Sequence, residues 1–397
     1  MRLATLAEIQ TGPFGSQLHK EDYVSEGTPI VTVEHLGNKN FTEQNLPCVS
    51  DKDRDRLKKY ILQEGDIVFS RVGSVDRCSF VSKRYSGWMF SGRCLRVRPR
   101  KMLNAEYLYY FFLLESTKQF VRNIATGATM PSINTKFMGE VPVAVPPLDV
   151  QEEIVKVLRN LDDKIQLNTE INKNLEQQAQ ALYKSWFVDF EPFNGTKPDD
   201  WNYGIVDDLA NEIICGKTPS TKVADYYGSD IPFITIPDMH GNVYTVSTER
   251  YLSLFGAQSQ AKKMLPKNSI CVSCIGTAGL VTLVATESQT NQQINSIIPK
   301  NGYSPFYIYL LMQTLSEVIN KLGQSGSTIV NLNKAQFSKI QVLVPSVTSM
   351  KEFDGTVSPL FSLILENQKE NIRLSSLRDT LLPKLMSGEI DVSDLDL

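Results

Sequence analysis

The sequence predicts an α/β (α+β) fold: two homologous globular domains separated by two long antiparallel coiled-coil helices, with a pseudo-twofold internal repeat. Three observations predict this class. The chain of 397 residues repeats itself in the same order at offsets of 199 to 204. Each copy opens with short β-branched runs around one aromatic-rich helix. Each copy then closes with a long heptad pattern, which is typical of helices that pair along their length.

Length and composition are those of a globular protein with two or three domains. Apolar residues make up 42% and charged residues 21% of the chain, which are ordinary values. Six cysteines are too few for a disulfide framework in a chain of this size. No apolar run approaches the roughly 18 residues of a membrane helix, and the opening "MRLATLAEIQTG" lacks the apolar stretch of a signal peptide. We therefore expect a cytoplasmic protein that does not associate with membranes.

Charge is unevenly distributed along the chain. The net charge of −3 argues against a protein that works alone on nucleic acid. Residues 1–147, however, carry 20 Lys/Arg against 15 Asp/Glu, whereas residues 148–198 and 347–397 are acidic. This distribution is compatible with DNA binding by parts of the chain.

The internal repeat is visible in collinear pairs of segments. The pairs are "GTPIVTV" (Gly27) with "DIPFITI" (Asp230), "LQEGDIVFSRVGS" (Leu62) with "LPKNSICVSCIGT" (Leu265), "EYLYYFF" (Glu106) with "FYIYLLM" (Phe306), "TGATMPSIN" (Thr126) with "SGSTIVNLN" (Ser325), and the segments that follow the last pair. Such matches in one order predict two copies of one architecture.

The first part of each copy predicts a compact mixed domain. In the first copy the short runs "TPIVTV", "GDIVFS" and "CLRVRP" are rich in β-branched residues, as strands are. They surround one helical segment, residues 105–124. Short strands with a single intervening helix indicate an α/β or α+β domain.

The second part of each copy predicts a long helix with a pairing seam. In the first copy the seam residues are Ile154, Leu158, Leu161, Ile165, Asn168, Asn172 and Leu175, continuing to Trp186; in the second they are Phe353, Leu360, Ile364, Asn367, Asn371 and Leu374, continuing to Leu385. Asparagines fall at the same two positions in both copies, and a polar seam residue tends to fix register at some cost in stability. We therefore expect one helix to pair with the other. The alternative is that each helix packs only on its own domain.

The length of these helices suggests a ruler. A helix of about 35 residues is about 50 Å long. If the two helices lie antiparallel, they place their domains at opposite ends, and one turn of B-DNA is about 34 Å. Pro383 should end or bend the second helix, because proline cannot donate its backbone hydrogen bond.

No catalytic or metal-binding set is recognisable in the sequence. The histidines His19, His35 and His240 are scattered, without the spacing of a metal site or a catalytic triad. "CGKT" at Cys215 lacks the first glycine of a phosphate loop and aligns with "TGPF" in the first copy. The CxxC of Cys271 and Cys274 aligns with Val68 and Arg71, which favours strand packing over redox or zinc chemistry. We expect no catalytic residue, metal or cofactor.

Three places in each copy present the polar side chains that read base edges. These candidates lie in the turn after "DIVFSR", in "FSGRCLRVR", in the repeated phrase after Thr126, and in their counterparts. They are Ser70, Arg71, Arg93, Arg96, Thr129, Asn134 and Lys136 in the first copy, and Ser273, Thr277, Gln292, Gln293, Thr328, Asn331 and Asn333 in the second. The frame persists while the polar residues differ, as expected if the copies bind different DNA sequences. The alternative is that such residues are solvated turns and helix caps.

At these segments the chain resembles the specificity subunit of type I restriction-modification systems. The resemblance is carried by "PPLDVQEEI" (Pro146), "LYKSWFVDFEPF" (Leu182) and "LLPKLMSGEI" (Leu381), together with the repeat order. The second helix departs from it, because it opens with "PSVTSMKEF".

The resemblance implies four segments. They are a target-recognition domain (1–147), a central conserved helix (148–190), a linker with a second target-recognition domain (191–346), and a distal conserved helix with a C-terminal tail (347–397). It also implies a non-catalytic subunit that binds a bipartite target in double-stranded DNA. Its implied partners are two S-adenosylmethionine-dependent methylation subunits and ATP-dependent restriction subunits.

Three other interpretations stay open from the sequence. One is a target-recognition subunit of another phage-defence modification system. Another is a coiled-coil scaffold without a nucleic-acid role, whose DNA affinity would be negligible and insensitive to salt. The last is an enzyme in its own right, which would methylate DNA without partners.

Overall fold

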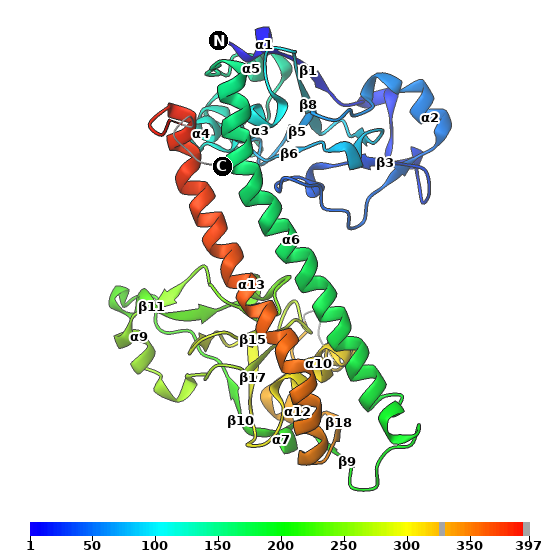
Figure 1. The fold of residues 1–397 in the computed structure, drawn as a ribbon, viewed down its shortest axis with the longest axis vertical. Coiled ribbons are helices and arrows are strands. Elements are labelled where there is room, and N and C mark those ends of the chain that lie inside the picture. Colours follow the sequence, from blue (N-terminus) through cyan, green and yellow to red (C-terminus); the bar gives the residue numbers. More distant parts are fainter. Residues whose placement is uncertain (325–329, 392–397) are drawn as a thin grey trace. The chain divides into compact units, whose positions relative to one another are not determined.

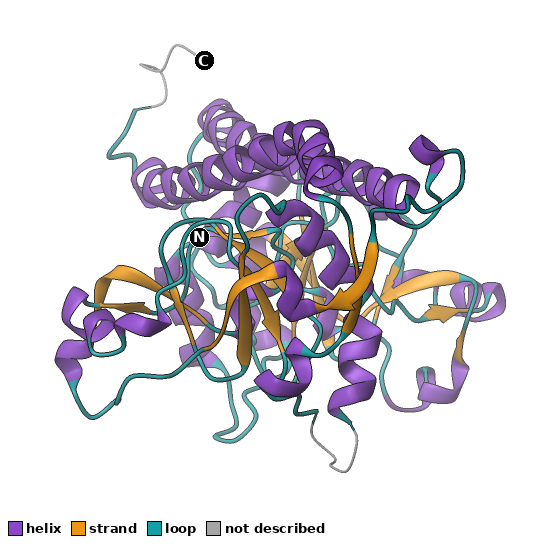
Figure 2. Cartoon of the chain, turned by 90° about the horizontal axis from the view of Figure 1, so that it is seen from below, coloured by secondary structure: helices purple, strands orange, loops and turns teal. Residues whose placement is uncertain are grey.

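The computed structural model describes residues 1–324 and 330–391, so the candidate Thr328 lies outside the described residues. The chain divides into two compact units, Met1–Asp163 with Ser375–Leu397 (unit 1) and Lys164–Leu374 (unit 2). Helix and strand are intermixed in the chain (Figure 2). Two helices, α6 (Leu148–Phe187) and α13 (Val347–Ser387), contribute residues to both units.

Unit 1 is built on an antiparallel sheet in the order β1-β8-β5-β6. Its strands are β1 (Ala7–Thr11), β8 (Cys94–Pro99), β5 (Ile67–Ser70) and β6 (Cys78–Phe80); a smaller sheet contains β2 (Tyr23–Val24), β4 (Cys48–Val49), β3 (Thr28–Val31) and β7 (Met89–Phe90). The helices are α1 (Leu3–Leu6), α2 (Asp51–Arg56), α3 (Ala105–Leu113), α4 (Glu115–Ile124) and α5 (Thr135–Gly139). The aromatic-rich helix α3 buries Tyr107 to Phe112 in the core against β5 and β8.

Unit 2 repeats this plan with additions. Its main sheet has the order β10-β17-β14-β15-β12, with β10 (Ala210–Cys215), β17 (Ile294–Pro299), β14 (Ile270–Ser273), β15 (Val281–Val284) and β12 (Tyr244–Thr245). Smaller sheets contain β13 (Tyr251–Leu252), β11 (Tyr227–Ile234) and β16 (Gln289–Thr290), and β18 (Gln341–Val344) with β9 (Asn202–Ile205). The helices are α7 (Val206–Leu209), α8 (Ile236–Met239), α9 (Leu254–Gln258), α10 (Pro305–Thr314), α11 (Ser316–Gly323) and α12 (Lys334–Ser338).

Strand pairing confirms the predicted class and its internal repeat. The pairs β1·β8, β5·β8 and β5·β6 are antiparallel, and so are their counterparts β10·β17, β14·β17 and β14·β15. The pairs β3·β7 and β11·β16 are both parallel. The two mixed domains therefore share one strand topology in these pairs.

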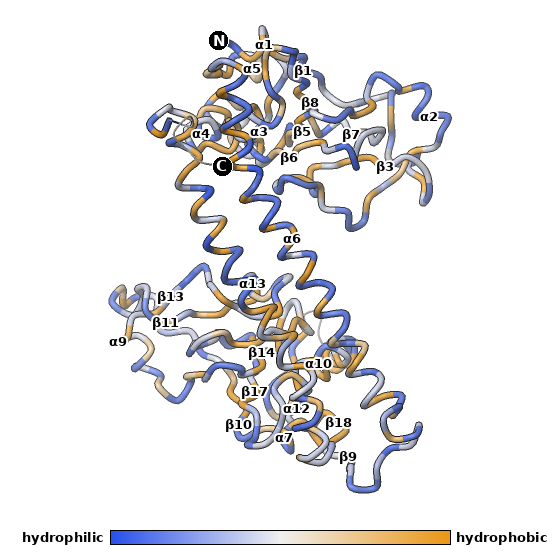
Figure 3. Tube along the Cα trace, in the orientation of Figure 1, coloured by the Kyte–Doolittle hydropathy of each residue, from blue (hydrophilic) through white to orange (hydrophobic). Residues whose placement is uncertain are grey.

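In unit 2, α6 and α13 run side by side and antiparallel (Figure 1). Asn168 donates to Asn371 at 2.9 Å, and Asn367 donates to Asn172 at 2.8 Å. Further along, Trp186 meets Phe353 with ring centroids 5.7 Å apart. Apolar and polar residues alternate along both helices (Figure 3). Of the other seam residues in this unit, Leu175, Phe353 and Ile364 are buried, and Ile165, Leu360 and Leu374 are half-buried.

In unit 1 the same two helices pair through different chemistry. Arg378 donates to Asp162 at 2.9 Å, and the Tyr110 hydroxyl donates to the same carboxylate at 2.6 Å. Leu382 and Leu385 of α13 join the core that contains the seam residues Ile154 and Leu158; Leu161 is half-buried.

Each long helix is tied to its mixed domain at its start. In unit 1 the buried side chain of Gln151 accepts from the backbone N–H of Asn104, the N-cap of α3, at 2.8 Å. In unit 2 the counterpart of Gln151 is the buried Met350, and Ser304, the N-cap of α10, donates to Asp354 at 2.6 Å instead. This exchange explains why the second helix departs from the "PPLDVQEEI" pattern and still begins at the equivalent position, Val347.

Of the expectation that α13 ends or bends about Pro383, the first part is wrong. The helix continues to Ser387, and Gly388, with φ +76°, ends it. Glu389 and Ile390 then donate backbone hydrogen bonds to the carbonyl of Lys384. A glycine in the left-handed region is the usual way to close a helix, because it satisfies the last carbonyls.

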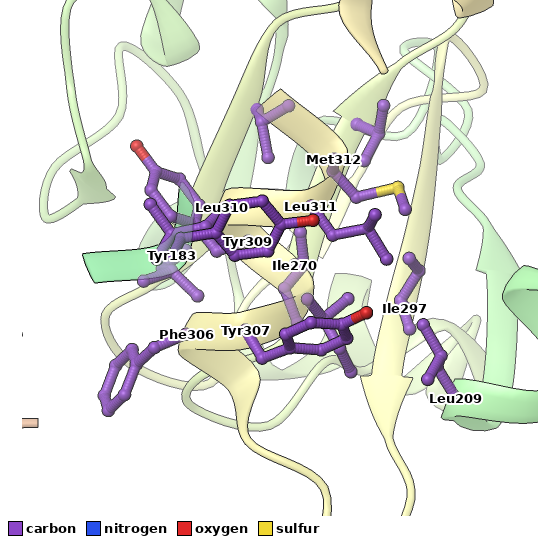
Figure 4. Packing of buried hydrophobic residues seen from close by; sticks show 14 of the residues in the cluster. Tyr183, Leu209, Ile270, Ile297, Phe306, Tyr307, Tyr309, Leu310, Leu311 and Met312 are labelled. Carbon is purple, nitrogen blue, oxygen red and sulfur yellow. The ribbon is translucent and has the colours of Figure 1, made fainter. Parts of the chain in front are cut away.

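The core of unit 2 is strongly aromatic where α10 meets the long helices. Figure 4 shows Tyr307 of α10 on the side of Ile270 and Ile297 of the sheet, and Tyr309 near Tyr183 of α6, while Phe306 points away from them. Phe306 stacks on Phe361 of α13 with centroids 4.4 Å apart. This ring pair joins α13 to α10 in the core of unit 2.

Replacing Phe361 by Ala should therefore destabilise unit 2 by about 3–5 kcal/mol, because a fully buried ring leaves a cavity. Urea unfolding followed by Trp186 and Trp201 fluorescence reports on this unit, since both belong to its core cluster; a Trp88→Phe background removes the unit 1 signal. The control Leu363→Ala, at a 47% exposed position of the same helix, should change stability by about 0.5 kcal/mol or less. Equal losses in both variants would contradict the packing.

Candidate nucleic-acid interface

Three loops meet beside the end of β5 in unit 1. Arg71 N–H donates to the carbonyl of Arg93 at 2.8 Å, and Ile133 N–H donates to the carbonyl of Arg71 at 3.0 Å. Gly73 N–H donates to the carbonyl of Pro131 at 2.8 Å. Backbone bonds thus join the turn after β5, the turn before β8 and the loop before α5. These are the three places that the sequence predicted to read DNA.

Unit 2 builds the same junction beside the end of β14. Cys274 N–H donates to Gln293 at 2.8 Å, Leu332 N–H to Cys274 at 2.9 Å, and Gly276 N–H to Val330 at 3.0 Å, each at a backbone carbonyl. Every one of these bonds has its counterpart in unit 1. The backbone frame is repeated, while the side chains on it differ.

A fourth loop belongs to each junction, and the sequence reasoning missed it. Gly12 N–H donates to the carbonyl of Cys94, and Gly216 N–H to that of Ile294, both at 3.1 Å. A Cβ at Gly12 would lie 2.1 Å from the carbonyl oxygen of Ser91, and one at Gly216 would lie 2.2 Å from that of Asn291. The alignment of "TGPF" with "CGKT" was the available signal, because both glycines allow this close approach.

The junction of unit 1 presents cationic and aromatic side chains. Phe14 is 57% exposed, and the Arg71 guanidinium lies 5.6 Å from its ring centroid. Arg71 Nη1 donates to the carbonyl of Gly92 at 3.2 Å. Arg93 is exposed on the neighbouring turn. Arginine with an adjacent aromatic ring suits contact with base edges and phosphates.

The junction of unit 2 presents neutral polar side chains. Gln292 is exposed, and its amide oxygen accepts from the hydroxyl of Thr218 at 2.8 Å. Thr277 and Asn331 are exposed beside it, and Gln293 is half-buried. Hydroxyl and amide groups both donate and accept, as base-edge recognition requires.

Of the other predicted residues, two serines are buried in the junction, two asparagines cap helices, and two residues are exposed without such a role. Ser70 and Ser273 are buried and bond to nearby backbone groups. Asn134 and Asn333 are exposed and cap α5 and α12, accepting from the backbone N–H groups of Phe137 and Gln336. Thr129 is exposed on the loop before α5, and Lys136 is exposed on the first turn of that helix.

Arg96 has a different position from the one expected. It is 1% exposed within β8, and it donates to the Glu8 carboxylate and to the carbonyl of Lys59. Burial, and next the neighbouring Arg98, lower the pKa of Arg96. A guanidinium enclosed in this way cannot reach a base edge, so we leave Arg96 out of the candidate interface.

The cysteines of the CxxC segment are packed in the core, Cys271 within β14 and Cys274 directly after its end. Cys271 and Cys274 are buried in different apolar clusters, and burial raises their pKa values to about 12 and about 11. Across residues 1–324 and 330–391 there is no group of three or more His, Cys, Asp or Glu side chains suited to a metal ion. Within that same part of the chain, no helix combines the length and apolarity needed to span a membrane.

A family model, curated relatives and a solved structure all point to one family, and their matches extend over most of the chain. The family model described as the type I restriction modification DNA specificity domain matches residues 1–177 and 198–373. The HindI specificity subunit of Haemophilus influenzae is 33% identical, covering 85% of this chain and 89% of that protein. The MjaIX specificity subunit of Methanocaldococcus jannaschii is 26% identical, covering 99% and 94%. The crystal structure of an S subunit from M. genitalium shares the fold, with a TM-score of 0.59 at 16% identity over 97% of this chain and 95% of that chain.

The burial of the cysteines predicts their reactivity. Brief iodoacetamide treatment of the folded chain at pH 8 should alkylate Cys48 and Cys215, which are partly exposed, before the buried cysteines Cys78, Cys94, Cys271 and Cys274. Peptide mass spectrometry gives the extent at each position, and treatment in urea should remove the differences. Early alkylation of Cys271 or Cys274 in the folded chain would contradict their burial in the core.

Proposed function

The chain belongs to the family of type I restriction-modification DNA specificity subunits, and we propose that its two units bind the two halves of a bipartite DNA target. The observation that carries this proposal is the junction of four loops in each unit, held by equivalent backbone bonds and presenting different exposed side chains. A repeated frame with unlike side chains suits two short sequences, here called words, that differ from each other.

We also propose that α6 and α13 set the gap between the words. With 40 and 41 residues these helices are each about 60 Å long, and each contributes to both units. The chain would supply sequence specificity to a complex in which methylation and restriction subunits carry out the chemistry on DNA. In this proposal the methylation subunits use S-adenosylmethionine, and the chain itself holds no cofactor.

Exchange of one domain tests whether the units act independently. Replacing residues 199–346 by the same region of a relative should change one word and leave the other word and the gap unaltered, since each junction is built within its own unit. Genome-wide mapping of methylated sites in cells with the complete system measures all three properties. The reciprocal exchange of residues 1–147 is the matched control and should change only the other word. A change of both words in either exchange would refute independent reading.

Lengthening both helices together tests the ruler. One heptad inserted after Asp163 in α6 and another after Leu374 in α13 leaves each unit intact and keeps the seam in phase. Seven residues add about 10 Å, so the methylation map should show a gap longer by about three base pairs, with both words unchanged. A heptad in α6 alone is the control and should abolish methylation, because the seams no longer match. An unchanged gap in the double insertion would refute the ruler.

A further inference from the structure

The two junctions obtain their most prominent polar side chain from different loops. In unit 1 the turn after β5 carries Arg71, and the turn before β8 carries Gly92. At the matching positions unit 2 has the small Cys274 and the long Gln292. At these two matching positions the frame therefore holds a long and a short side chain in opposite order, and the exposed Arg93 follows Gly92 on the same turn of unit 1.

In unit 1 the local packing requires this order. A Cβ at Gly92 would lie 2.4 Å from the carbonyl oxygen of Pro13, so no side chain fits there. The Gly92 carbonyl instead accepts from Arg71 Nη1. With the Phe14 ring 5.6 Å away, this bond fixes the guanidinium while Phe14 itself stays exposed. Arg71 is thus prepared for a ligand before one arrives.

In unit 2 the opposite order is equally fixed. Cys274 is 1% exposed and belongs to the core, so the turn after β14 offers no long side chain at this point. Gln292 is exposed, and the Thr218 hydroxyl holds its amide oxygen. Thr218 is the counterpart of Phe14. The loop after β1 therefore positions Arg71 in unit 1, and the loop after β10 positions Gln292 in unit 2. Because the amide group is planar, this bond to its oxygen also fixes the orientation of the Gln292 amide nitrogen.

The two side chains suit different bases. A planar guanidinium donates to O6 and N7 of guanine, whereas a glutamine amide donates to N7 and accepts from N6 of adenine. Resting on the function proposed above, we propose that Arg71 contacts a guanine in the word bound by unit 1 and that Gln292 contacts an adenine in the word bound by unit 2. Phe14 and Thr218 act as positioning residues for these contacts.

Isosteric or charge-conserving variants test the proposal in cells that carry the complete system. Arg71→Lys keeps the charge and its attraction to phosphate but loses the planar fork. It should relax one G·C position in the unit 1 word and leave the unit 2 word unchanged. Gln292→Glu loses the N7 donor and should relax one A·T position in the unit 2 word alone. The methylation map reads both outcomes.

Base analogues identify the contacted atom. Duplexes with 7-deazaguanine at the relaxed position of the unit 1 word, or 7-deazaadenine at that of the unit 2 word, lack the N7 acceptor. Each should weaken binding of the wild-type complex by roughly 5- to 150-fold, and should have little effect on the matching variant. The controls are Arg100→Ala and Asn301→Ala. These residues follow the ends of β8 and β17, whereas the junctions lie at the starts of those strands, so both variants should retain both words.

Two results would overturn the inference. One is uniform weakening of binding without relaxed base choice in either variant, which would make Arg71 and Gln292 phosphate contacts. The other is wild-type binding that ignores the loss of N7. Both are distinct from failure of the proposed function, in which exchange of residues 199–346 would leave both words unchanged.

Discussion

The rest of the structure depends on the pairing of α6 with α13, because neither core is complete without both helices. Unit 1 places Ile154 and Leu158 of α6 beside Leu382 and Leu385 of α13. Unit 2 does the same with other stretches of the two helices, including Leu175 of α6 and Ile364 of α13. These contacts join residues about 200 positions apart, and such non-local contacts must overcome a large loop-closure entropy. The pairing therefore completes both cores through contacts that carry this entropic cost.

The pairing uses unlike chemistry at equivalent positions. Asp162 in unit 1 corresponds to Phe361 in unit 2, and Arg378 corresponds to Ala179. The first pair is an ion pair with the Tyr110 hydroxyl attached, whereas the second places a small residue near a ring stacked on Phe306. Pairing α6 with another α6 would leave Asp162 opposite alanine and without its arginine. Asp162 would keep Lys39, whose ammonium lies 3.6 Å from the carboxylate, but it would lose the hydrogen-bonded ion pair with Arg378, so this difference favours pairing of α6 with α13.

The sequence predicted those features that rest on periodicity and repetition. The repeat follows from matching segments, and the long helices with asparagines in their seam follow from heptad spacing. The three candidate places were found from equivalent positions in the two copies, but their meeting at one junction is seen only in the structure. The burial of Arg96 did not follow, because a charged residue in a strand gives no sign of which face it occupies until its partners are known. The loop at Gly12 was missed for a similar reason: its role depends on close approach to Ser91, about 80 residues away. The continuation of α13 past Pro383 reflects tertiary packing, with Leu382 and Leu385 buried on either side of the proline.

On the function proposed above, the junctions would let one fold accommodate many DNA sequences. Their geometry is held by backbone hydrogen bonds and by close glycine contacts, none of which requires a particular exposed side chain. Exchange of arginine for cysteine on one loop and of glycine for glutamine on the other leaves those bonds intact, as the two units demonstrate. Since side chains on a rigid frame lose little further freedom on binding, their donors and acceptors can distinguish bases efficiently. In this proposal specificity changes through a few surface substitutions, while the buried helix seam within each unit is kept.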